Sequence, residues 1–406
     1  MHILFVCRFL PHSLARDSGR LDTYHYIKSL SEQHTVSLIA FVTPEDRPGI
    51  AEMEAICAKV IAVPFDRMGL WPRLSRAWWR LLQPQVYGRN LSDPYRRALQ
   101  SYVATTECDV AVVHGMMAEY GRYLAHIPAV LDEVDLFFMV AHQLFRRTRN
   151  PLARRWARFD WLRTMAREVD HLNDYAGVFV RSVKDEMIVR DLVPGQNLAV
   201  LPPWFEGLEE LQMIPVQRPF NNNLLFVGAM NIPPNIEAVT FFAQQVLPKI
   251  RRLVPDAQLH IVGGNPDPAV QKLAAEPGVT VTGEVPALAP YYADCAVAIT
   301  PLFVGGGIIV KTLNGLASGR PVVTTQVGNS GTGAINGRDL LIVPPDPDIM
   351  ANTVTQLLTN QQQWQQLAEQ GRHFIQAHYN WSEIIKNLTD FLHQIAFGEG
   401  SPPVKR

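Results

Sequence analysis

Three consecutive glycines, Gly305, Gly306 and Gly307, precede a predicted helix at residues 310–318 that carries Lys311 in its first turn. Glycine lacks a Cβ, so a glycine turn can bring backbone N–H groups close to a ligand. A helix N-terminus favours negative charge, and a lysine ammonium adds a mobile positive charge there. This arrangement predicts a binding site for an anion such as a phosphate. The alternatives are a flexible turn for the glycines and an ordinary surface lysine for Lys311.

A second group of polar residues follows two predicted strands of the first half. Asp132, Glu133 and Asp135 lie in the segment VLDEVDLF, and His114 ends the segment VVH. A carboxylate in such a loop could bind a hydroxyl group or accept its proton, and Asp135 is the preferred candidate. The alternatives are a helix N-cap formed by Asp132 or Asp135, and a structural role for His114.

The elements that must position these residues are short apolar strands alternating with helices. Nearly continuous apolar strands in this rhythm indicate α/β architecture with parallel sheets covered on both faces. The predicted strands of the first half are residues 2–7, 35–41, 59–63, 110–114, 129–132, 178–181 and 199–201. Those of the second half are residues 224–228, 258–263, 279–282, 296–300, 321–325 and 340–343.

A proline-rich break near residues 202–219 suggests a hinge between two doubly wound domains. Ligands of such sheets bind at the carboxyl ends of the strands, so we expect the site there. The predicted division is a first domain at 1–203, a second at 204–380, a C-terminal helix at 381–397 that crosses back to the first domain, and a disordered tail at 398–406.

Composition excludes several classes of protein. The 406 residues carry 37 basic and 38 acidic side chains, a net charge of −1, which excludes a strongly basic nucleic-acid binder. The four cysteines form no CxxC pair, so we expect neither a zinc ribbon nor a disulfide scaffold, and a reducing compartment such as the cytoplasm is favoured. We find no signal peptide and no spanning segment in the sequence.

Two segments rich in Arg and Trp, 71–80 and 145–167, supply much of the positive charge. One interpretation is a solvated helix face. A second is a peripheral contact with anionic lipid on the inner face of the membrane, because amphipathic Arg/Trp helices lie well in that interface. A third is that some of these arginines meet an anionic acceptor.

Residues 305–325 (GGGIIVKTLNGLASGRPVVTT) resemble the donor-site helix of the GT-B retaining glycosyltransferases of the group 1, or family 4, type. Weaker similarities occur in the same order along the chain. The matching positions are Lys311, Leu316, Ala317, Gly319, Pro321, Val322 and Val323, with further similarity at 17–20, 182–185, 225–228, 261–263, 281–284 and 381–384.

The resemblance implies two Rossmann-like domains facing across a cleft. It also implies transfer of a sugar, with retention, from a nucleotide-diphosphate sugar to the hydroxyl of a sugar, glycan or lipid-linked acceptor, in glycan, polysaccharide or glycolipid synthesis. The nucleotide-sugar is a substrate, and neither a metal nor another cofactor is expected. Implied catalytic residues are Lys311, Asp135 and Asp132; donor-binding residues are Gly19, Arg20, Gly228, Gly263, Gly283, Glu284, Gly305, Gly306, Gly307, Ile308 and Asn314; acceptor-side candidates are His114 and Glu133.

The sequence departs from the family pattern at several positions. Asn314 replaces the glutamate that typically holds the ribose, and Gly306 stands at the position of a second glutamate. Ala229 follows Gly228 where many members carry Arg, and Val134 stands where the acceptor domain normally has His. Two alternatives therefore remain open: a non-catalytic nucleotide- or glycan-binding protein, and a nucleotide-sugar epimerase of the same fold.

The segment Asp346-Pro347-Asp348 matches the D-x-D metal motif of another glycosyltransferase fold. It precedes a predicted helix, so we interpret it as a turn and an N-cap.

Overall fold

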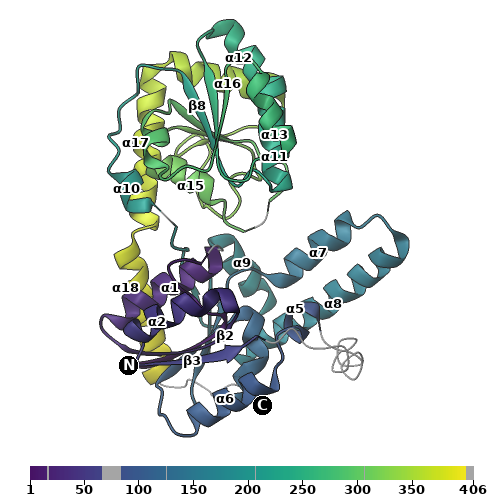
Figure 1. Cartoon of the computed structure of the whole chain (residues 1–406), viewed down its shortest axis with the longest axis vertical. Helices are drawn as coiled ribbons and strands as arrows, with labels where there is room; N and C mark the ends of the chain where they lie inside the picture. The colour runs from purple at the N-terminus through teal and green to yellow at the C-terminus, as the bar shows by residue number, and fades with distance from the viewer. Residues whose placement is uncertain (16–17, 66–83, 125, 206, 306, 399–406) are drawn as a thin grey trace. The chain divides into compact units, whose positions relative to one another are not determined.

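The computed structural model describes residues 1–15, 18–65, 84–124, 126–205, 207–305 and 307–398 (Figure 1). The chain divides into two compact units, which are described separately. The first comprises Met1–Trp204 with Trp381–Arg406, and the second comprises Phe205–Asn380. The boundary predicted after residue 203 falls one residue before this division.

The first unit is built on a seven-stranded sheet with the strand order β3-β2-β1-β4-β5-β6-β7. Every neighbouring pair is parallel, as the apolar strand sequences predict. All seven predicted strands are confirmed to within two residues. They are β1 (His2–Phe9), β2 (Thr35–Val42), β3 (Lys59–Pro64), β4 (Val110–His114), β5 (Ala129–Glu133), β6 (Gly177–Val180) and β7 (Leu198–Val200).

Helices cover the first sheet, and the chain's last helix, α18 (Trp381–Phe397), is one of them. The Trp381 Nε1–H donates to Ser29 Oγ at 3.0 Å, and the side chains of Phe391 and Ile395 pack against Gly177 of β6. Among the described residues, the other α-helices of this unit are α1 (Ser18–Ser31), α2 (Arg47–Ile56), α5 (Gln85–Gly88), α6 (Asp93–Val103), α7 (Phe137–Arg147), α8 (Pro151–Asp174) and α9 (Val183–Leu192).

The second unit holds a six-stranded parallel sheet with the order β10-β9-β8-β11-β12-β13. The six predicted strands are confirmed as β8 (Asn223–Val227), β9 (Gln258–Val262), β10 (Val279–Gly283), β11 (Val297–Thr300), β12 (Val322–Thr324) and β13 (Leu341–Ile342). Its helices are α10 (Leu208–Gln212), α11 (Pro233–Phe241), α12 (Leu247–Leu253), α13 (Pro268–Lys272), α14 (Ala289–Ala293), α15 (Val310–Ala317), α16 (Pro347–Thr359) and α17 (Gln361–His378).

The predicted helix at 235–253 is present as α11 and α12, joined without a loop by a π-helical turn at Phe242–Val246. In both sheets the strand order reverses direction at the first strand of the unit: β1 lies between β2 and β4, and β8 lies between β9 and β11. The carboxyl ends of the strands at such a reversal are where ligands bind in open α/β sheets.

Candidate active site

Glycines occupy the carboxyl edge of three neighbouring strands of the second sheet. Gly228 follows β8, Gly263 follows β9 and Gly283 ends β10. The Gly228 N–H donates to Val262 O and the Gly263 N–H donates to Gly283 O, each at 3.0 Å. A Cβ at Gly263 would lie 1.8 Å from the carbonyl oxygen of Gly228, so only glycine fits there. The structure thus brings three of the predicted donor residues together in one backbone-lined edge.

Lys311 reaches this edge from the first turn of α15. Its ammonium lies 4.6 Å from the centre of the Phe226 ring and donates to Asn235 Oδ1 in α11. A Cβ at Gly228 would lie 3.0 Å from the Lys311 Nζ, so the charge sits directly beside the loop that follows β8. Burial lowers the pKa of Lys311 to about 8. The ammonium is therefore charged at neutral pH but poorly solvated, and a bound anion would stabilise it.

The turn before α15 contains other predicted donor residues. Gly307 has a φ of 67°, a left-handed conformation that favours glycine, and Ile308 follows it. The N–H of Ile309 donates to Ser330 O at 3.2 Å, which ties the turn to the chain after β12. Gly305 packs against Ile309, whereas Gly306 lies outside the described residues. The interpretation of this turn as a phosphate site stays a prediction.

Two further donor candidates differ in exposure. Glu284 follows Gly283 and is exposed, with its side chain beside Gly264. Asn314 is buried in α15 beside Tyr292. A contact between Asn314 and the ribose stays a prediction. The Asn314 side chain also packs in the interior of this unit.

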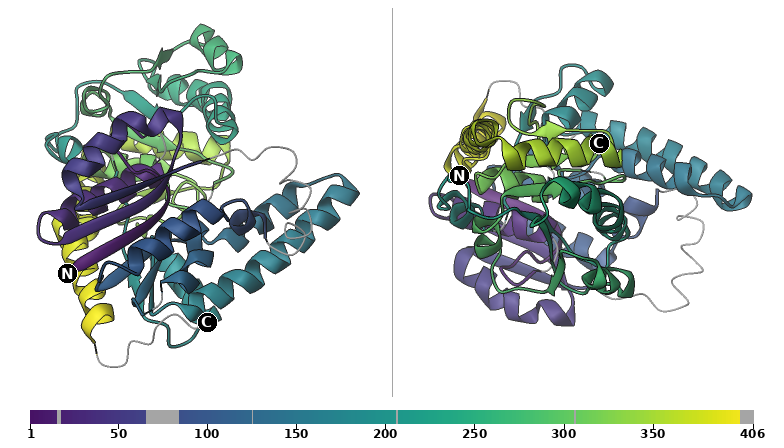
Figure 2. Two further views of the ribbon diagram at one scale, coloured as in Figure 1. Left: turned by 60° about the horizontal axis from the view of Figure 1, so that its bottom comes forward. Right: turned by 90° about the horizontal axis from the view of Figure 1, so that it is seen from above.

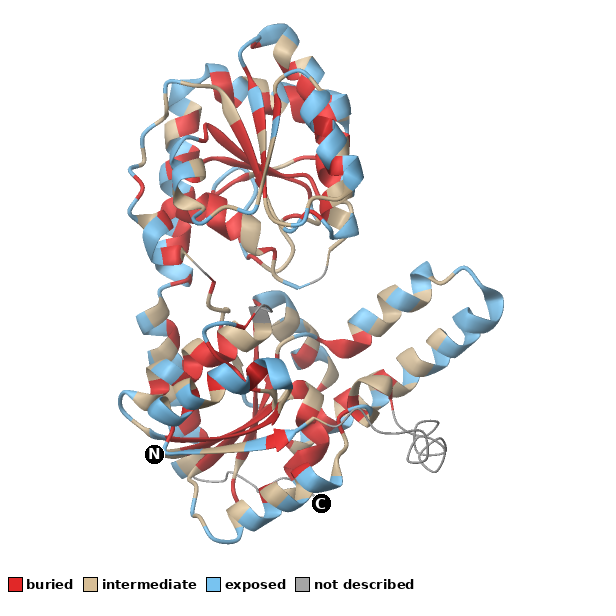
Figure 3. Ribbon diagram, in the orientation of Figure 1, coloured by how far each residue is buried: buried red, intermediate tan, exposed pale blue. Residues whose placement is uncertain are grey.

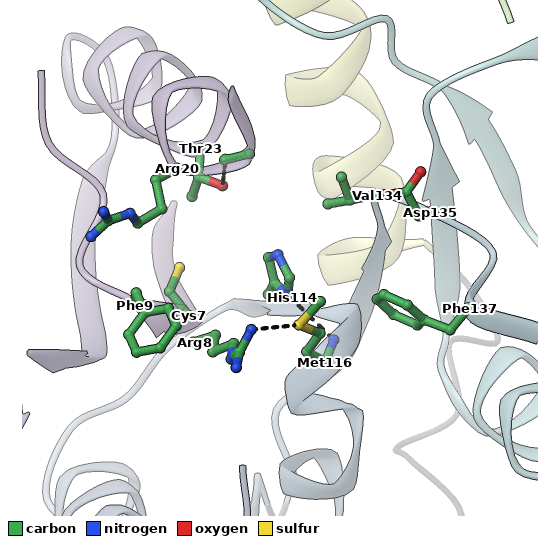
Figure 4. A pocket seen from close by; sticks show the side chains of 11 residues that line it. Cys7, Arg8, Phe9, Arg20, Thr23, His114, Met116, Val134, Asp135 and Phe137 are labelled. Carbon is green, nitrogen blue, oxygen red and sulfur yellow. Dashed lines mark hydrogen bonds between the residues drawn. The ribbon is translucent and has the colours of Figure 1, made fainter. Parts of the chain in front are cut away.

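The first unit contains a pocket of about 210 Å³ at the carboxyl edge of its sheet (Figure 4). Three elements and one loop meet there: the end of β1, the start of α1, the end of β4 and the loop between β5 and α7. The pocket brings together four of the predicted residues, Gly19, Arg20, His114 and Asp135. The other lining residues are Cys7, Arg8, Phe9, Thr23, Met116, Val134 and Phe137.

The pocket combines basic and acidic groups. Asp135 is exposed at the mouth of the pocket, but partial desolvation and the nearby Asp185 raise its pKa, so this carboxyl holds its proton more strongly than a fully solvated aspartate. The Nδ1 of His114 accepts from the Met116 N–H at 3.3 Å, which places the proton of a neutral ring on Nε2. Figure 4 shows Asp135 across the pocket from Arg20, whose guanidinium pairs with Asp46 at 2.6 Å.

Asp132 is placed in the interior of the first unit rather than in the pocket. Its carboxylate pairs with the Arg181 guanidinium at 2.9 Å, and Arg181 also pairs with Asp22 at 2.9 Å. All three side chains are buried. Asp22 in turn accepts from the Trp204 N–H at 2.8 Å. The contacts of Asp132 therefore favour a structural role over the predicted catalytic one.

Glu133 is also buried and does not line the pocket. Burial, with the neighbouring Glu168 as the next cause, raises its pKa well above the ordinary value. Glu168 itself accepts from the N–H groups of Phe137 and Phe138 at 2.7 Å each, so it caps the start of α7. Glu133 is thus part of the packing beneath α7 and not an exposed acceptor group.

The predicted N-cap at Asp346 is confirmed. Its Oδ1 accepts from the N–H groups of Asp348 at 2.9 Å and Ile349 at 3.0 Å, and Pro347 begins α16.

Among the described residues, no group of three or more His, Cys, Asp or Glu side chains could hold a metal ion. Within the same part of the chain, no helix has both the length and the apolar character to cross a membrane.

Several residues of these sites were missed by sequence reasoning. Arg8 lines the pocket, donates to Asn90 Oδ1 at 2.9 Å and directly follows the apolar run of β1, a position that could have been recognised. Phe226 and Asn235, the partners of Lys311, carried no recognisable signal because they lie on other elements. Arg181 ends a predicted strand, and only its burial between two carboxylates reveals its role.

Comparison with known proteins gives a family for the second unit. Residues 221–360 match the model of the family described as "Glycosyl transferases group 1". The match covers these 140 of the 406 residues. The matched range includes Gly228, Gly263, Gly283 and Lys311, so the glycine edge and its lysine lie within it. The predicted resemblance is confirmed over this range.

Curated relatives align with part of the chain. An uncharacterised 44.6 kDa protein of the cps region of Klebsiella pneumoniae is 26% identical over 43% of this chain and 49% of its own length. A GDP-mannose-dependent alpha-(1-6)-phosphatidylinositol monomannoside mannosyltransferase of Mycobacterium tuberculosis is 32% identical over 36% of this chain and 42% of its own length. The alignments thus span just under half of each relative.

Solved structures match nearly the whole chain. Sucrose-phosphate synthase from Thermosynechococcus elongatus has a TM-score of 0.64 at 18% identity, covering 97% of this chain and 99% of its own. Anabaena HepE in complex with UDP has a TM-score of 0.64 at 14% identity, covering 97% and 100%. TarM has a TM-score of 0.65 at 8% identity, covering 96% and 98%. Together with the two parallel sheets, these similarities establish the GT-B fold of the chain.

Proposed function

We propose that this chain is a glycosyltransferase that moves a sugar from a nucleotide-diphosphate sugar to an acceptor hydroxyl, with retention of configuration. The observation that carries the proposal is the position of the Lys311 ammonium beside Gly228, at the glycine edge of the group 1 domain. A diphosphate leaving group requires a cation next to backbone N–H groups that it can approach closely.

On the donor side, negative charge grows on the diphosphate as the bond between sugar and phosphate breaks. Fixed positive charge that is already in place stabilises this state without further reorganisation. Ala229 and Met230 follow Gly228 in this chain, so the loop itself brings no basic side chain at these two positions. Lys311 supplies the charge to the same loop from α15, and the N-terminal N–H groups of that helix add to it.

On the acceptor side, the pocket of the first unit would hold the hydroxyl that attacks the sugar. Asp135 and His114 both line it and both can exchange hydrogen bonds with a hydroxyl. The proposed acceptor is a sugar, a glycan or a lipid-linked glycan, and the proposed place of action is the cytoplasm. The reaction as proposed uses the nucleotide-sugar as substrate, with neither a metal ion nor another cofactor.

The choice of donors to test follows from the relatives. Anabaena HepE was solved with UDP, and the Mycobacterium tuberculosis relative is named as GDP-mannose-dependent. We therefore propose incubation of the full chain with UDP- and GDP-linked hexoses, with and without a panel of mono- and disaccharide acceptors, while nucleotide release is recorded. Release that depends on an acceptor supports transfer.

The alternatives give different results in the same experiment. Asn314 in place of a family glutamate and Val134 in place of a family histidine favour a protein that binds without turnover. Such a protein would be thermally stabilised by a nucleotide-sugar across the panel with no nucleotide released. Release without any acceptor, together with inversion at C2 of the sugar, would indicate an epimerase. The proposal is contradicted if no donor stabilises the protein against heat and no donor is turned over.

A further inference from the structure

Helices α7 and α8 form an antiparallel hairpin that stands out from the first sheet (Figure 2). Buried residues occur only near its root, as Figure 3 shows. The seam between the two helices is aromatic. Trp161 of α8 stacks on Phe145 of α7 with ring centres 5.7 Å apart and contacts His142 at 4.6 Å. The face of α8 that carries Trp161 is thus occupied by α7.

The opposite face of α8 carries a row of exposed apolar side chains. Successive helix residues are about 100° apart, so positions 152, 156, 159 and 163 share one face and position 161 lies on the other. Leu152, Trp156 and Phe159 are 79%, 40% and 50% exposed. The guanidinium of Arg163 lies 5.4 Å from the Trp156 ring centre and 4.9 Å from that of Phe159. Three large apolar residues in one row, all exposed, are characteristic of a binding surface.

The same hairpin is strongly basic. Residues 140–163 contain seven arginines, no lysine and one acidic residue, Asp160, in a chain whose net charge is −1. Asp160 pairs with Arg163 at 2.7 Å, so its charge is already compensated. Arg155 and Arg158 are exposed on α8, and Arg155 lies beside the apolar row. The arginines fit a partner with a negatively charged surface. The apolar row beside them fits a partner that is also apolar beneath that charged layer.

We propose that the α7–α8 hairpin docks on the surface of an anionic lipid bilayer. The row Leu152, Trp156 and Phe159 would enter the boundary between head groups and acyl chains, where tryptophan is favoured. The arginines near it would bind the anionic head groups and strengthen the attachment to the surface. A second copy of the chain is a poorer partner, because two hairpins of the same charge would repel each other. A nucleic acid offers the charge but no apolar layer for Leu152.

The test is co-sedimentation of the full-length protein with vesicles of phosphatidylcholine alone and of phosphatidylcholine with about one third phosphatidylglycerol. We expect at least tenfold tighter binding to the anionic vesicles. Trp156→Ser with Phe159→Ser should weaken that binding at least tenfold, and so should Arg155→Glu with Arg158→Glu. Because all four side chains are exposed, unchanged melting temperatures would show that the variants fold.

A matched control lies on the second unit, where Arg252 and Leu253 are adjacent exposed residues of α12. Arg252→Glu with Leu253→Ser should leave vesicle binding unchanged. The proposal is overturned if the wild type does not bind anionic vesicles, or if the control and the hairpin variants behave alike. It is equally overturned if light scattering shows a dimer that the Trp156→Ser and Phe159→Ser changes dissociate, or if RNA binds more tightly than the vesicles. None of these measurements requires sugar transfer, so the two proposals can fail separately.

Discussion

The Lys311 ammonium lies 4.6 Å from the centre of the Phe226 ring, although the two residues belong to α15 and β8. The ring and the Asn235 side chain hold the charge beside the loop that follows β8. A cation held over an aromatic face in a poorly solvated site is stabilised only in part. This residual cost is what a bound diphosphate would remove.

Replacing Lys311 should therefore affect activity and stability in opposite directions. We expect Lys311→Met to lower turnover about 100-fold or more, on the scale of one lost electrostatic contact in the transition state. The same change should raise the melting temperature of the second unit, because it removes a charge that is partly buried and poorly solvated. Nucleotide release and thermal unfolding of one preparation measure both effects. Lys249→Met, at a surface pair with Asp348, is the control that should change neither. A near-normal rate in Lys311→Met would count against the phosphate role.

The pKa of Lys311 predicts a dependence on pH. Burial lowers this pKa from 10.5 to about 8, so the free protein loses the charge as the pH rises through 8. We expect kcat/KM for the donor to fall above about pH 8. The unfolded chain keeps this proton up to its ordinary pKa, so the stability of the second unit should rise between pH 8 and 10.5. Pre-steady-state rates and chemical unfolding across this range provide the measurements. If Lys311→Met shows the same pH profile as the wild type, another group is responsible.

Asp132 and Asp135 should respond differently to substitution. Asp132→Ala leaves the buried Arg181 guanidinium with Asp22 as its remaining carboxylate, so we expect a loss of about 3 kcal/mol in the free energy of unfolding. Asp135→Asn should keep the melting temperature and lower the transfer rate at least tenfold, because this carboxyl lines the pocket. Donor binding should be unchanged in Asp135→Asn. It is measured as the protection that a bound nucleotide gives against unfolding. The opposite pattern for the two variants would contradict both assignments.

Two glycines of the donor edge provide a comparison of steric and conformational effects. In Gly263→Ala the new methyl group would meet the Gly228 carbonyl oxygen, so β8 and β9 must separate. We expect at least a tenfold loss of nucleotide affinity and a marked loss of stability. In Gly283→Ala the φ of 75° is strained, but the new methyl carbon would have no neighbouring atom within 4 Å. We therefore expect a loss of about 1 kcal/mol in the free energy of unfolding. Fluorescent-nucleotide titration and thermal unfolding measure the difference, and equal effects would refute the close approach.

The sequence by itself determined the strands and their order along the chain. Short apolar runs predicted all thirteen strands found among the described residues, because a strand buried on both faces of a parallel sheet must be apolar along its whole length. The N-cap at Asp346 was equally predictable, since a cap depends on residues only two and three positions away. The glycines at 228, 263 and 283 could be placed at strand ends because each one directly follows or ends an apolar run.

Only the tertiary structure decided which side chains meet. Asp132 and Asp135 stand three residues apart, yet the first pairs with Arg181 in the interior and the second lines the pocket. Sequence spacing could not separate them, because the choice depends on where β5 ends and on the arginine that follows the neighbouring strand β6. Lys311 likewise finds Phe226 and Asn235 only through the strand order, and the outer face of α8 is identified only by the helix that covers its other side. Local composition fixes an element, whereas contacts between distant residues depend on how the elements pack.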